Sequence, residues 1–220
     1  MTIRSIRSRT HTGAGLGLAL LMLAAPLGAQ VVYSGGAPAG SNSNDIFDDF
    51  RAADNFALAG PATFNSIRFW ALLPTGSVYT PSIYWELLHD DGGLPGASVA
   101  SGLVTAMMTF RTALAFGFDS WQADLSVAET SLGAGVFWLA LHDGALGDAT
   151  GSTMFWETSD SGYGADYAVD FIPSGEWTGE WEGNLAFELS HTVPEPPSVT
   201  LVLIGLVGVA AVRRRGKPRA

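Results

Sequence analysis

Short runs of alternating or apolar residues recur through the middle of this chain, and clusters of turn-forming residues separate them. In the stretch FNSIRFWALL, Ile67, Phe69 and Ala71 fall on one side of an extended backbone, while the residues between them fall on the other. The stretches LPTGS, DDGGLPG and DGALGDATGS consist of residues that favour turns. No amphipathic helix of about twelve residues fits between them. This pattern predicts an all-β fold, an antiparallel β-sandwich with jelly-roll-like connections.

We expect this sandwich to occupy residues 30–192 as one domain, and the hydrophobic fraction of 47% is ample for its core. Its first part, residues 30–44, is mostly Gly, Ala, Ser, Pro and Asn, a composition typical of a flexible lead-in. The expected strands are 47–50, 54–58, 64–72, 82–89, 103–109, 113–118, 121–124, 136–142, 154–157, 168–171 and 185–190.

Residues 1–29 contain the three regions of a secretory signal peptide in the usual order. Arg4, Arg7 and Arg9 form a basic start without any acid, an apolar run of 12 residues follows, and Ala29 supplies a small residue before the cleavage point. The alternative is a buried N-terminal helix of a cytosolic domain. Because no Arg-Arg pair precedes the apolar run, the sequence favours the general export route over the twin-arginine route.

The chain ends in a segment, residues 193–220, that combines a proline-rich joint, an apolar run and a basic tail. The apolar run 198–212 predicts a short hydrophobic helix, and its 15 residues fall short of the roughly 20 that a permanent transmembrane helix needs. The prolines of the joint break any helix that would extend back into the domain. The basic tail 213–220 would stay on the cytoplasmic side of the membrane. The segment is therefore typical of either a marginal membrane anchor or a sorting signal that is removed during processing.

This segment resembles the PEP-CTERM sorting domain of exported proteins from Gram-negative bacteria that make extracellular polysaccharide. The residues that match, in the expected order around the apolar helix, are Pro194, Glu195, Pro196, Arg213, Arg214 and Arg215. The resemblance implies export across the inner membrane, recognition by exosortase and cleavage near the Pro-Glu-Pro. The protein would be held in the membrane transiently and would then lie at the cell surface or outside the cell. The alternative is a tail anchor without processing.

The body of the chain also resembles ectodomains that often precede such a tail. The stretches that carry this second resemblance are 53–56, 67–73, 85–96 and 135–141. The resemblance supports the sandwich and implies no assigned activity.

Charge is unevenly distributed along the chain. Residues 31–192 contain 20 acidic residues and only three basic ones, Arg51, Arg68 and Arg111, which leaves 17 net negative charges. Nucleic acid is therefore excluded as a partner, because its binding requires clustered Lys and Arg. Neutral polysaccharides and divalent cations remain compatible. The chain contains no cysteine, so disulfides, zinc-thiolate sites and thiol nucleophiles are excluded.

Two tryptophans in the stretch GEWTGEWEG are candidates for binding sugars. Trp177 and Trp181 are four residues apart, and residues at this spacing share one face of an extended strand. Their indole rings would then form a platform on which a sugar ring stacks. The alternative is that both rings cover the edge of the core beside a loop.

The stretch NDIFDDFRAAD supplies carboxylates of the kind that calcium prefers. Asp45, Asp48, Asp49 and Asp54 are the candidate ligands, although their spacing does not match the calcium-binding loop of EF-hands. The alternative is that these residues are solvated surface charges. No other cofactor is indicated.

Two similar stretches end in a His-Asp pair, which places His89 and Asp90 at one strand end and His142 and Asp143 at another. The functional interpretation joins the two pairs into a metal or acid-base site, and the structural one treats them as ordinary strand ends. The sequence predicts a non-enzymatic binding or structural protein associated with exopolysaccharide or biofilm. The alternative is a glycan-processing enzyme that uses acidic residues, with Glu86, Glu157, Glu176 and Glu180 as candidates.

Overall fold

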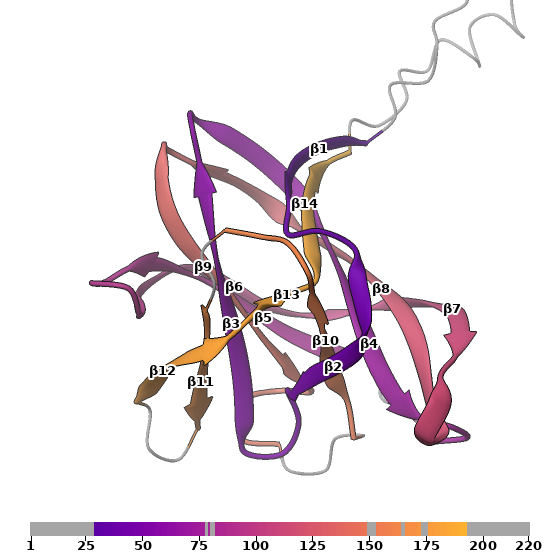
Figure 1. Cartoon of the computed structure of the whole chain (residues 1–220). Coiled ribbons are helices and arrows are strands. Elements are labelled where there is room, and N and C mark those ends of the chain that lie inside the picture. Colours follow the sequence, from indigo (N-terminus) through magenta and orange to yellow (C-terminus); the bar gives the residue numbers. More distant parts are fainter. Residues whose placement is uncertain are drawn as a thin grey trace, which may run out of the picture. The chain divides into compact units, whose positions relative to one another are not determined.

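The computed structural model describes residues 29–77, 79, 82–148, 153–163, 166–172 and 176–192. All of them belong to one compact unit, Leu27–Pro194. Within these residues the regular structure is almost entirely β, in two antiparallel sheets whose side chains share one hydrophobic core (Figure 1). The prediction of an all-β, sandwich-like fold is thereby confirmed.

The larger sheet, called sheet A, is built around β4. Its strands are β1 (Gln30–Ser34), β2 (Pro38–Asp45), β4 (Ala62–Pro74), β7 (Met107–Ala113), β8 (Phe118–Leu132), β10 (Phe155–Ser159), β13 (Asn184–Leu185) and β14 (Phe187–His191). β8 runs along the whole of β4, while β14 and β10 pair with successive parts of β4. β1 continues the sheet beyond β14, β2 and β13 pair with β10, and β7 pairs with β8.

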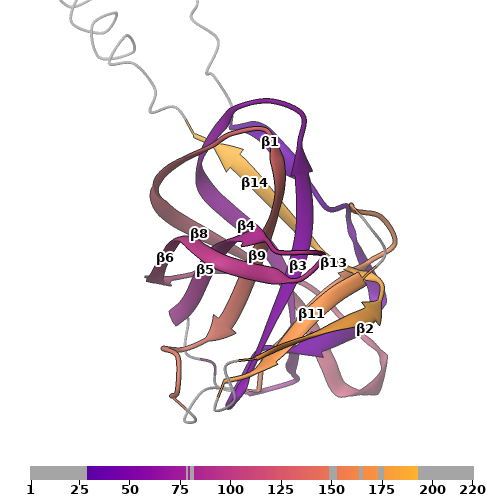
Figure 2. The same cartoon turned by 90° about the vertical axis from the view of Figure 1, so that its left-hand side faces the viewer.

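The smaller sheet, called sheet B, has the order β12-β11-β3-β9-β5-β6. Its strands are β3 (Phe50–Leu58), β5 (Ser82–Asp90), β6 (Pro95–Thr105), β9 (Gly135–Asp143), β11 (Asp166–Phe171) and β12 (Trp177–Glu182). Figure 2 shows β3 and β11 side by side, as their pairing requires. The chain crosses from one sheet to the other several times, for example from β3 to β4 and from β8 to β9.

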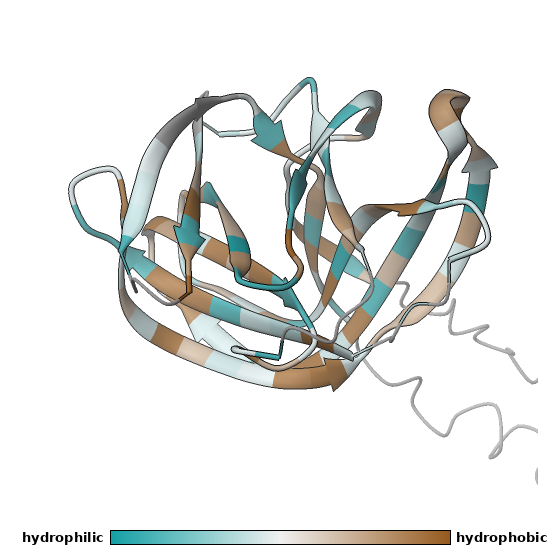
Figure 3. Ribbon diagram, turned by 90° about the horizontal axis from the view of Figure 1, so that it is seen from below, coloured by the Kyte–Doolittle hydropathy of each residue, from teal (hydrophilic) through white to brown (hydrophobic). Residues whose placement is uncertain are grey.

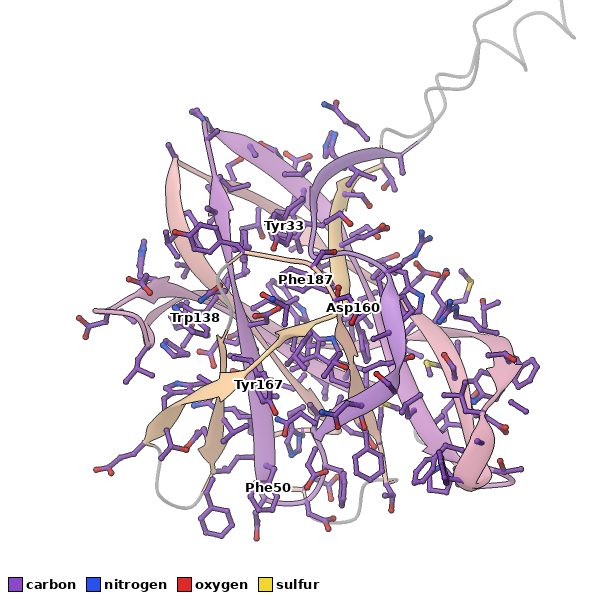
Figure 4. The ribbon with its side chains drawn as sticks, in the orientation of Figure 1. Tyr33, Phe50, Trp138, Asp160, Tyr167 and Phe187 are labelled. Atoms are coloured by element: carbon purple, nitrogen blue, oxygen red, sulfur yellow. The ribbon has the colours of Figure 1, made fainter. Side chains whose placement is uncertain are left out.

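The core lies between the sheets because each strand alternates apolar and polar side chains, which Figure 3 shows as alternating colours along the ribbons. Phe56 of β3 lies 5.9 Å, ring centre to ring centre, from Phe187 of β14, which joins the two sheets. Tyr33 of β1 lies 5.1 Å from Phe187, and both rings lie near the middle of Figure 4. Trp156 of β10 is fully buried beside the same phenylalanine.

A second, smaller cluster lies on the face of sheet B that points away from the core. Its buried members are Ala53, Leu88, Trp138, Ala140 and Ala168. Figure 4 shows Trp138 well apart from Tyr33 and Phe187. Leu94, from the turn between β5 and β6, and Trp177 of β12 pack against this cluster, which we call the outer cluster. Sheet B therefore buries apolar side chains on both faces.

The structure differs from the expected strands in several places. The expected strand 47–50 is a turn that leads into β3, because Asp48 has φ 57° and the N–H of Phe50 donates to the carbonyl oxygen of Phe47. The expected strand 103–109 is divided between β6 and β7 at Ala106, and β12 was not expected.

The lead-in 30–44 forms β1 and β2, because the edges of β14 and β10 offer unpaired backbone groups to this segment. Gly36 makes the turn between them at φ 95°, and a side chain there would collide with Ser161. Residues 113–118 form no strand: β7 ends at Ala113, and the short helix η1 (Ala115–Gly117) turns the chain into β8.

Candidate functional site

A hollow of about 430 Å³ opens on sheet A between β2 and the connection from β7 to β8. One wall is formed by a polar segment of β2 and the other by apolar and aromatic residues. The residues that define these two walls are Ser41, Asn42 and Ser43 on the polar side and Leu114, Phe116 and Phe118 on the apolar side. This pairing of hydrogen-bonding groups with aromatic rings suits a ligand that has both hydroxyl groups and C–H faces, as sugars do.

Phe116 is the most exposed large apolar residue among those described. Its side chain is 97% exposed and its backbone has φ 73°, in the left-handed region that residues other than Gly rarely adopt. The connection that carries it projects from the body at the right of Figure 1. A residue other than glycine in this conformation adds backbone strain, and strained residues cluster at functional sites, so this feature marks the hollow as a functional candidate.

A buried carboxylate lies directly behind the hollow. The backbone N–H of Gly40, which lines the hollow, donates to Glu157. Ser120 Oγ donates to Glu157 Oε2 at 3.0 Å, and Arg111 Nη1 lies 3.1 Å from Ser120 Oγ and 4.0 Å from that carboxylate oxygen. Burial raises the pKa of Glu157, and these three partners limit the rise. The Glu157 side chain is 1% exposed, and the network joins β2, β7, β8 and β10 behind the hollow.

The outer face of sheet B holds a second group of charges, which we call the Arg51 cluster. Arg51 Nε donates to Asp170 Oδ2 at 2.8 Å, and Arg51 Nη1 donates to Glu86 Oε2 at 2.7 Å. The guanidinium lies 4.4 Å from the ring centre of Trp177. Asp170 Oδ1 is buried and has no hydrogen-bond partner within the described part of the chain. The cluster links β3, β5, β11 and β12, and both of its carboxylates form ion pairs with Arg51.

The two candidate tryptophans differ in their surroundings. Trp177 pairs with Asp170 on β11, where it covers Arg51 and the outer cluster. Trp181 pairs with Tyr167, which belongs to the core, and a bulge lies between the two pairs. The bulge interrupts the alternation on which a shared face depends. The side chain of Trp181 lies outside those described, so the two-ring platform stays a prediction.

Gly179, between these tryptophans, is explained by packing. A Cβ atom at this position would collide with Leu94, which reaches across from the turn between β5 and β6. The same turn is fixed by Asp90, whose carboxylate accepts a hydrogen bond from Trp138 Nε1 at 2.9 Å. The DDGGLPG turn therefore covers the outer cluster.

The four candidate calcium ligands differ in burial and in their position along the chain. Asp54 is fully buried between the sheets, while Asp45 ends β2 and Asp48 and Asp49 form the turn into β3. Among the described residues, no three His, Asp or Glu side chains form a group that could hold a metal ion. The structure thus does not bring these four carboxylates together, and calcium binding stays a prediction.

Asp54 instead connects the sheets. Its Oδ2 accepts the backbone N–H of Leu185 from sheet A at 2.8 Å, and its Oδ1 accepts the N–H of Asn55 at 3.0 Å. Burial raises the pKa of Asp54 well above its ordinary value, against the effect of these two N–H groups. Burial, together with the charge of Asp54, also raises the pKa of Tyr33 to about 12.

The two His-Asp pairs lie at opposite ends of sheet B. Since β5 and β9 are antiparallel, His142 pairs with Tyr84 and His89 pairs with Phe137. His142 is fully buried, and its Nδ1 and Nε2 lie 3.1 Å from the carbonyl oxygen of Gly144 and 2.9 Å from that of Asp48. A joint site is therefore wrong, and His142 instead lies between the turns that contain Asp48 and Gly144.

The sorting residues Pro194, Glu195, Pro196, Arg213, Arg214 and Arg215 lie outside the described residues, and so do the helix 198–212 and most of the leader. Within the described ranges, no helix has the length and apolarity to cross a membrane.

Sequence reasoning missed both the hollow and the Arg51 cluster. The scarcity of arginine was a usable signal, because all three arginines in the described residues bind carboxylates. The hollow left no comparable signal, since its polar wall comes from a segment expected to lack structure. A scan against protein-family models matched no family, and a search of curated proteins found no match.

Proposed function

We propose that this chain is an exported, non-enzymatic protein that binds neutral polysaccharide outside the cell, as part of an exopolysaccharide or biofilm matrix. The hollow between β2 and the exposed Phe116 is the observation that carries this proposal, because it places a strand segment of serine and asparagine residues opposite an aromatic ring. All described arginines are bound to acids, so a neutral polymer suits this surface better than an anionic one.

Export and sorting to the outside of the cell form part of the proposal. The basic and apolar leader of residues 1–29 supports export, and the order of Pro-Glu-Pro, apolar run 198–212 and arginines supports recognition by exosortase at the membrane. We also propose that the strands are connected as in a jelly roll, which the repeated crossings of the chain between the two sheets support.

Binding to a panel of neutral polysaccharides tests this function. We expect Phe116→Ala and Asn42→Ala to weaken binding at least about tenfold, as loss of a stacking ring or of a buried hydrogen bond does. Melting temperatures should stay unchanged. Tyr163→Ala is the matched control, because this ring is also exposed but does not line the hollow.

The same panel separates the hollow from the tryptophan platform. If Trp177→Ala or Trp181→Ala removes binding without unfolding the protein while Phe116→Ala does not, the site lies on β12 instead. Absence of binding to every polysaccharide in the panel would refute the proposal.

A glycan-processing enzyme is the second candidate, favoured by one observation: the raised pKa of Glu157 beside the hollow. Polysaccharide turnover that vanishes in Glu157→Gln while binding persists would support an enzyme. Binding without turnover across the panel would exclude it for those substrates.

A further inference from the structure

The sandwich is open at one end, where two aromatic rings on the core-facing side of sheet B remain in contact with solvent. Phe50 of β3 and Phe171 of β11 are paired across these strands, and their ring centres lie 5.4 Å apart. They lie two residues from Ala52 and Val169, which pack in or against the core, and residues two apart share a face of a strand. Phe50 and Phe171 are nevertheless 40% and 45% exposed, so sheet A does not cover this end. Figure 4 shows Phe50 at the lower end of β3.

A cleft of about 210 Å³ lies at this open end, between β2 of sheet A and the strands β3 and β11 of sheet B. The described residues that line it are Asn44, Asp45, Phe50 and Val169. Asn44 is paired with the buried Trp156 on β10, and directly paired residues share a face, so Asn44 lies on the core-facing side of sheet A. Pockets for drug-sized ligands begin at roughly 300 Å³. The cleft therefore suits a group of about one ring.

The two polar side chains of the cleft are available to a ligand. Asn44 Nδ2 is buried and has no hydrogen-bond partner within the described part of the chain. Burial raises the pKa of Asp45, and no hydrogen bond from the described residues offsets that rise. Burial, together with the charge of Asp45, also raises the pKa of Tyr167, so the carboxylate lies near a third aromatic ring. The cleft thus offers a hydrogen-bond donor and an acceptor beside aromatic rings.

These side chains select the ligand by its chemistry. An apolar group would leave the Asn44 amide and the Asp45 carboxylate unpaired, which is costly. An anion would be repelled by Asp45. A quaternary ammonium ion suits aromatic rings and a carboxylate, but it offers no acceptor to the amide. A neutral sugar ring satisfies every group, because its hydroxyl groups both donate and accept hydrogen bonds and its C–H face packs on aromatic rings.

The cleft and the hollow lie on opposite faces of sheet A. Leu72, which lines the hollow, lies between Ala71 and Leu73 of the core and therefore points away from the core, whereas Asn44 points toward it. Two ligands can therefore be bound at once. We infer that the cleft is a second site, for one neutral sugar residue, so that a single molecule holds two polysaccharide segments and cross-links them. The cross-linking rests on the proposed function of the hollow, whereas sugar binding in the cleft does not.

Single-ring probes test the cleft apart from the hollow. The methyl glycosides of glucose, galactose and mannose would be titrated into the full chain in a detergent that contains no sugar, and binding would be followed by NMR saturation transfer. All variants would carry Phe116→Ala, which impairs the hollow. We expect Phe50→Leu or Asn44→Ala, added to this background, to weaken glycoside binding about tenfold. Phe110→Ala is the matched control, because this ring is 52% exposed but does not line the cleft.

Cross-linking is measured as bridging between two samples of one polymer. The protein would be bound to immobilised dextran, laminarin or galactomannan, and a fluorescent soluble sample of the same polymer would then be added. We expect the native chain to capture the labelled polymer. Phe50→Leu should still bind the immobilised polymer through the hollow but should capture at least about tenfold less of the label. Association through the hydrophobic tail would affect both proteins alike, so it does not produce this difference.

Two outcomes would overturn the inference and leave the proposed function standing. One is undiminished capture by Phe50→Leu, and the other is glycoside binding that neither Phe50→Leu nor Asn44→Ala lowers. Glycoside binding that depends on Phe50, in a protein that holds no polymer, would refute cross-linking and the proposed function of the hollow. The cleft would then stand as a site for a free sugar.

Discussion

Two arginines on consecutive strands bind two carboxylates each, yet their environments differ. Arg51 of β3 holds Glu86 and Asp170 on sheet B, with side-chain exposures of 14%, 11% and 1%. Arg68 of β4 holds Asp124 and Glu188 on sheet A, with exposures of 41%, 17% and 25%. Trp177 covers the first guanidinium at 4.4 Å, whereas the second remains open to water.

The difference lies in how far each arginine reaches. Arg68 faces both of its acids directly across neighbouring strands. Arg51 faces Asp170 but must reach over β9 to Glu86, which pairs with Ala140 on that strand. The small Ala140 side chain leaves room for this path. The result is a desolvated cluster whose parts depend on one another, while the group around Arg68 is a set of screened surface pairs.

The largest expected effect follows from removing the buried cation. We expect Arg51→Met to lower the free energy of unfolding by about 3–5 kcal/mol, because it leaves the carboxylates of Asp170 and Glu86 buried without a partner. Denaturant unfolding followed by tryptophan fluorescence measures this loss.

A combined variant sharpens that result. Arg51→Met together with Glu86→Gln and Asp170→Asn removes the unpaired charges and should recover part of the lost stability. A triple variant less stable than Arg51→Met would contradict the view that buried, unpaired charge causes the loss.

Asp54 provides an intermediate case, a buried carboxylate that forms no ion pair with any residue in the described part of the chain. Its pKa is raised above the ordinary value of 3.8, so the folded protein holds this proton more tightly than the unfolded chain does. The resulting stability is fully present below that ordinary value and is lost as pH rises through the raised pKa.

The measurement is the pH dependence of unfolding for the native chain and for Asp54→Asn. The advantage of the native chain over the variant should be greatest at the acid end and should shrink as pH rises. An advantage that grows with pH would show that the carboxylate is stabilised in its ionised form.

The smallest effect is expected at the exposed arginine. Arg68→Met should cost less than about 1 kcal/mol, because its acids can be solvated by water once the cation is gone. Even this loss should shrink in about 1 M salt, which screens exposed charges. A cost equal to that of Arg51→Met would remove the distinction between the two groups.

The fold was largely predictable because alternation along each strand is a local property. The run that contains Ile67, Phe69 and Ala71 became β4, and the expected strand 82–89 became β5 almost unchanged. Strand ends were less predictable. β8 extends to Leu132 through a polar stretch, since pairing with β4 and not hydrophobicity sets its length.

The sites were less predictable because they depend on which strands are neighbours. Arg51 and Asp170 are 119 residues apart in the sequence, and no local pattern indicates that β3 lies beside β11. The tryptophan pair shows the converse problem. The spacing in GEWTGEWEG is local, but β12 has a bulge between the two residues that the sequence does not reveal, so the spacing alone does not decide whether the two rings share a face.

The position of β14 has a mechanical consequence. This strand lies between β1 and β4, antiparallel to both, and the chain leaves it only a few residues before Pro194. Any tension applied from the C-terminal side and directed along β14 would act on two rows of backbone hydrogen bonds perpendicular to the pull. Such bonds are loaded together in shear and not opened one after another. A protein tethered by its tail would therefore resist being drawn apart from that end.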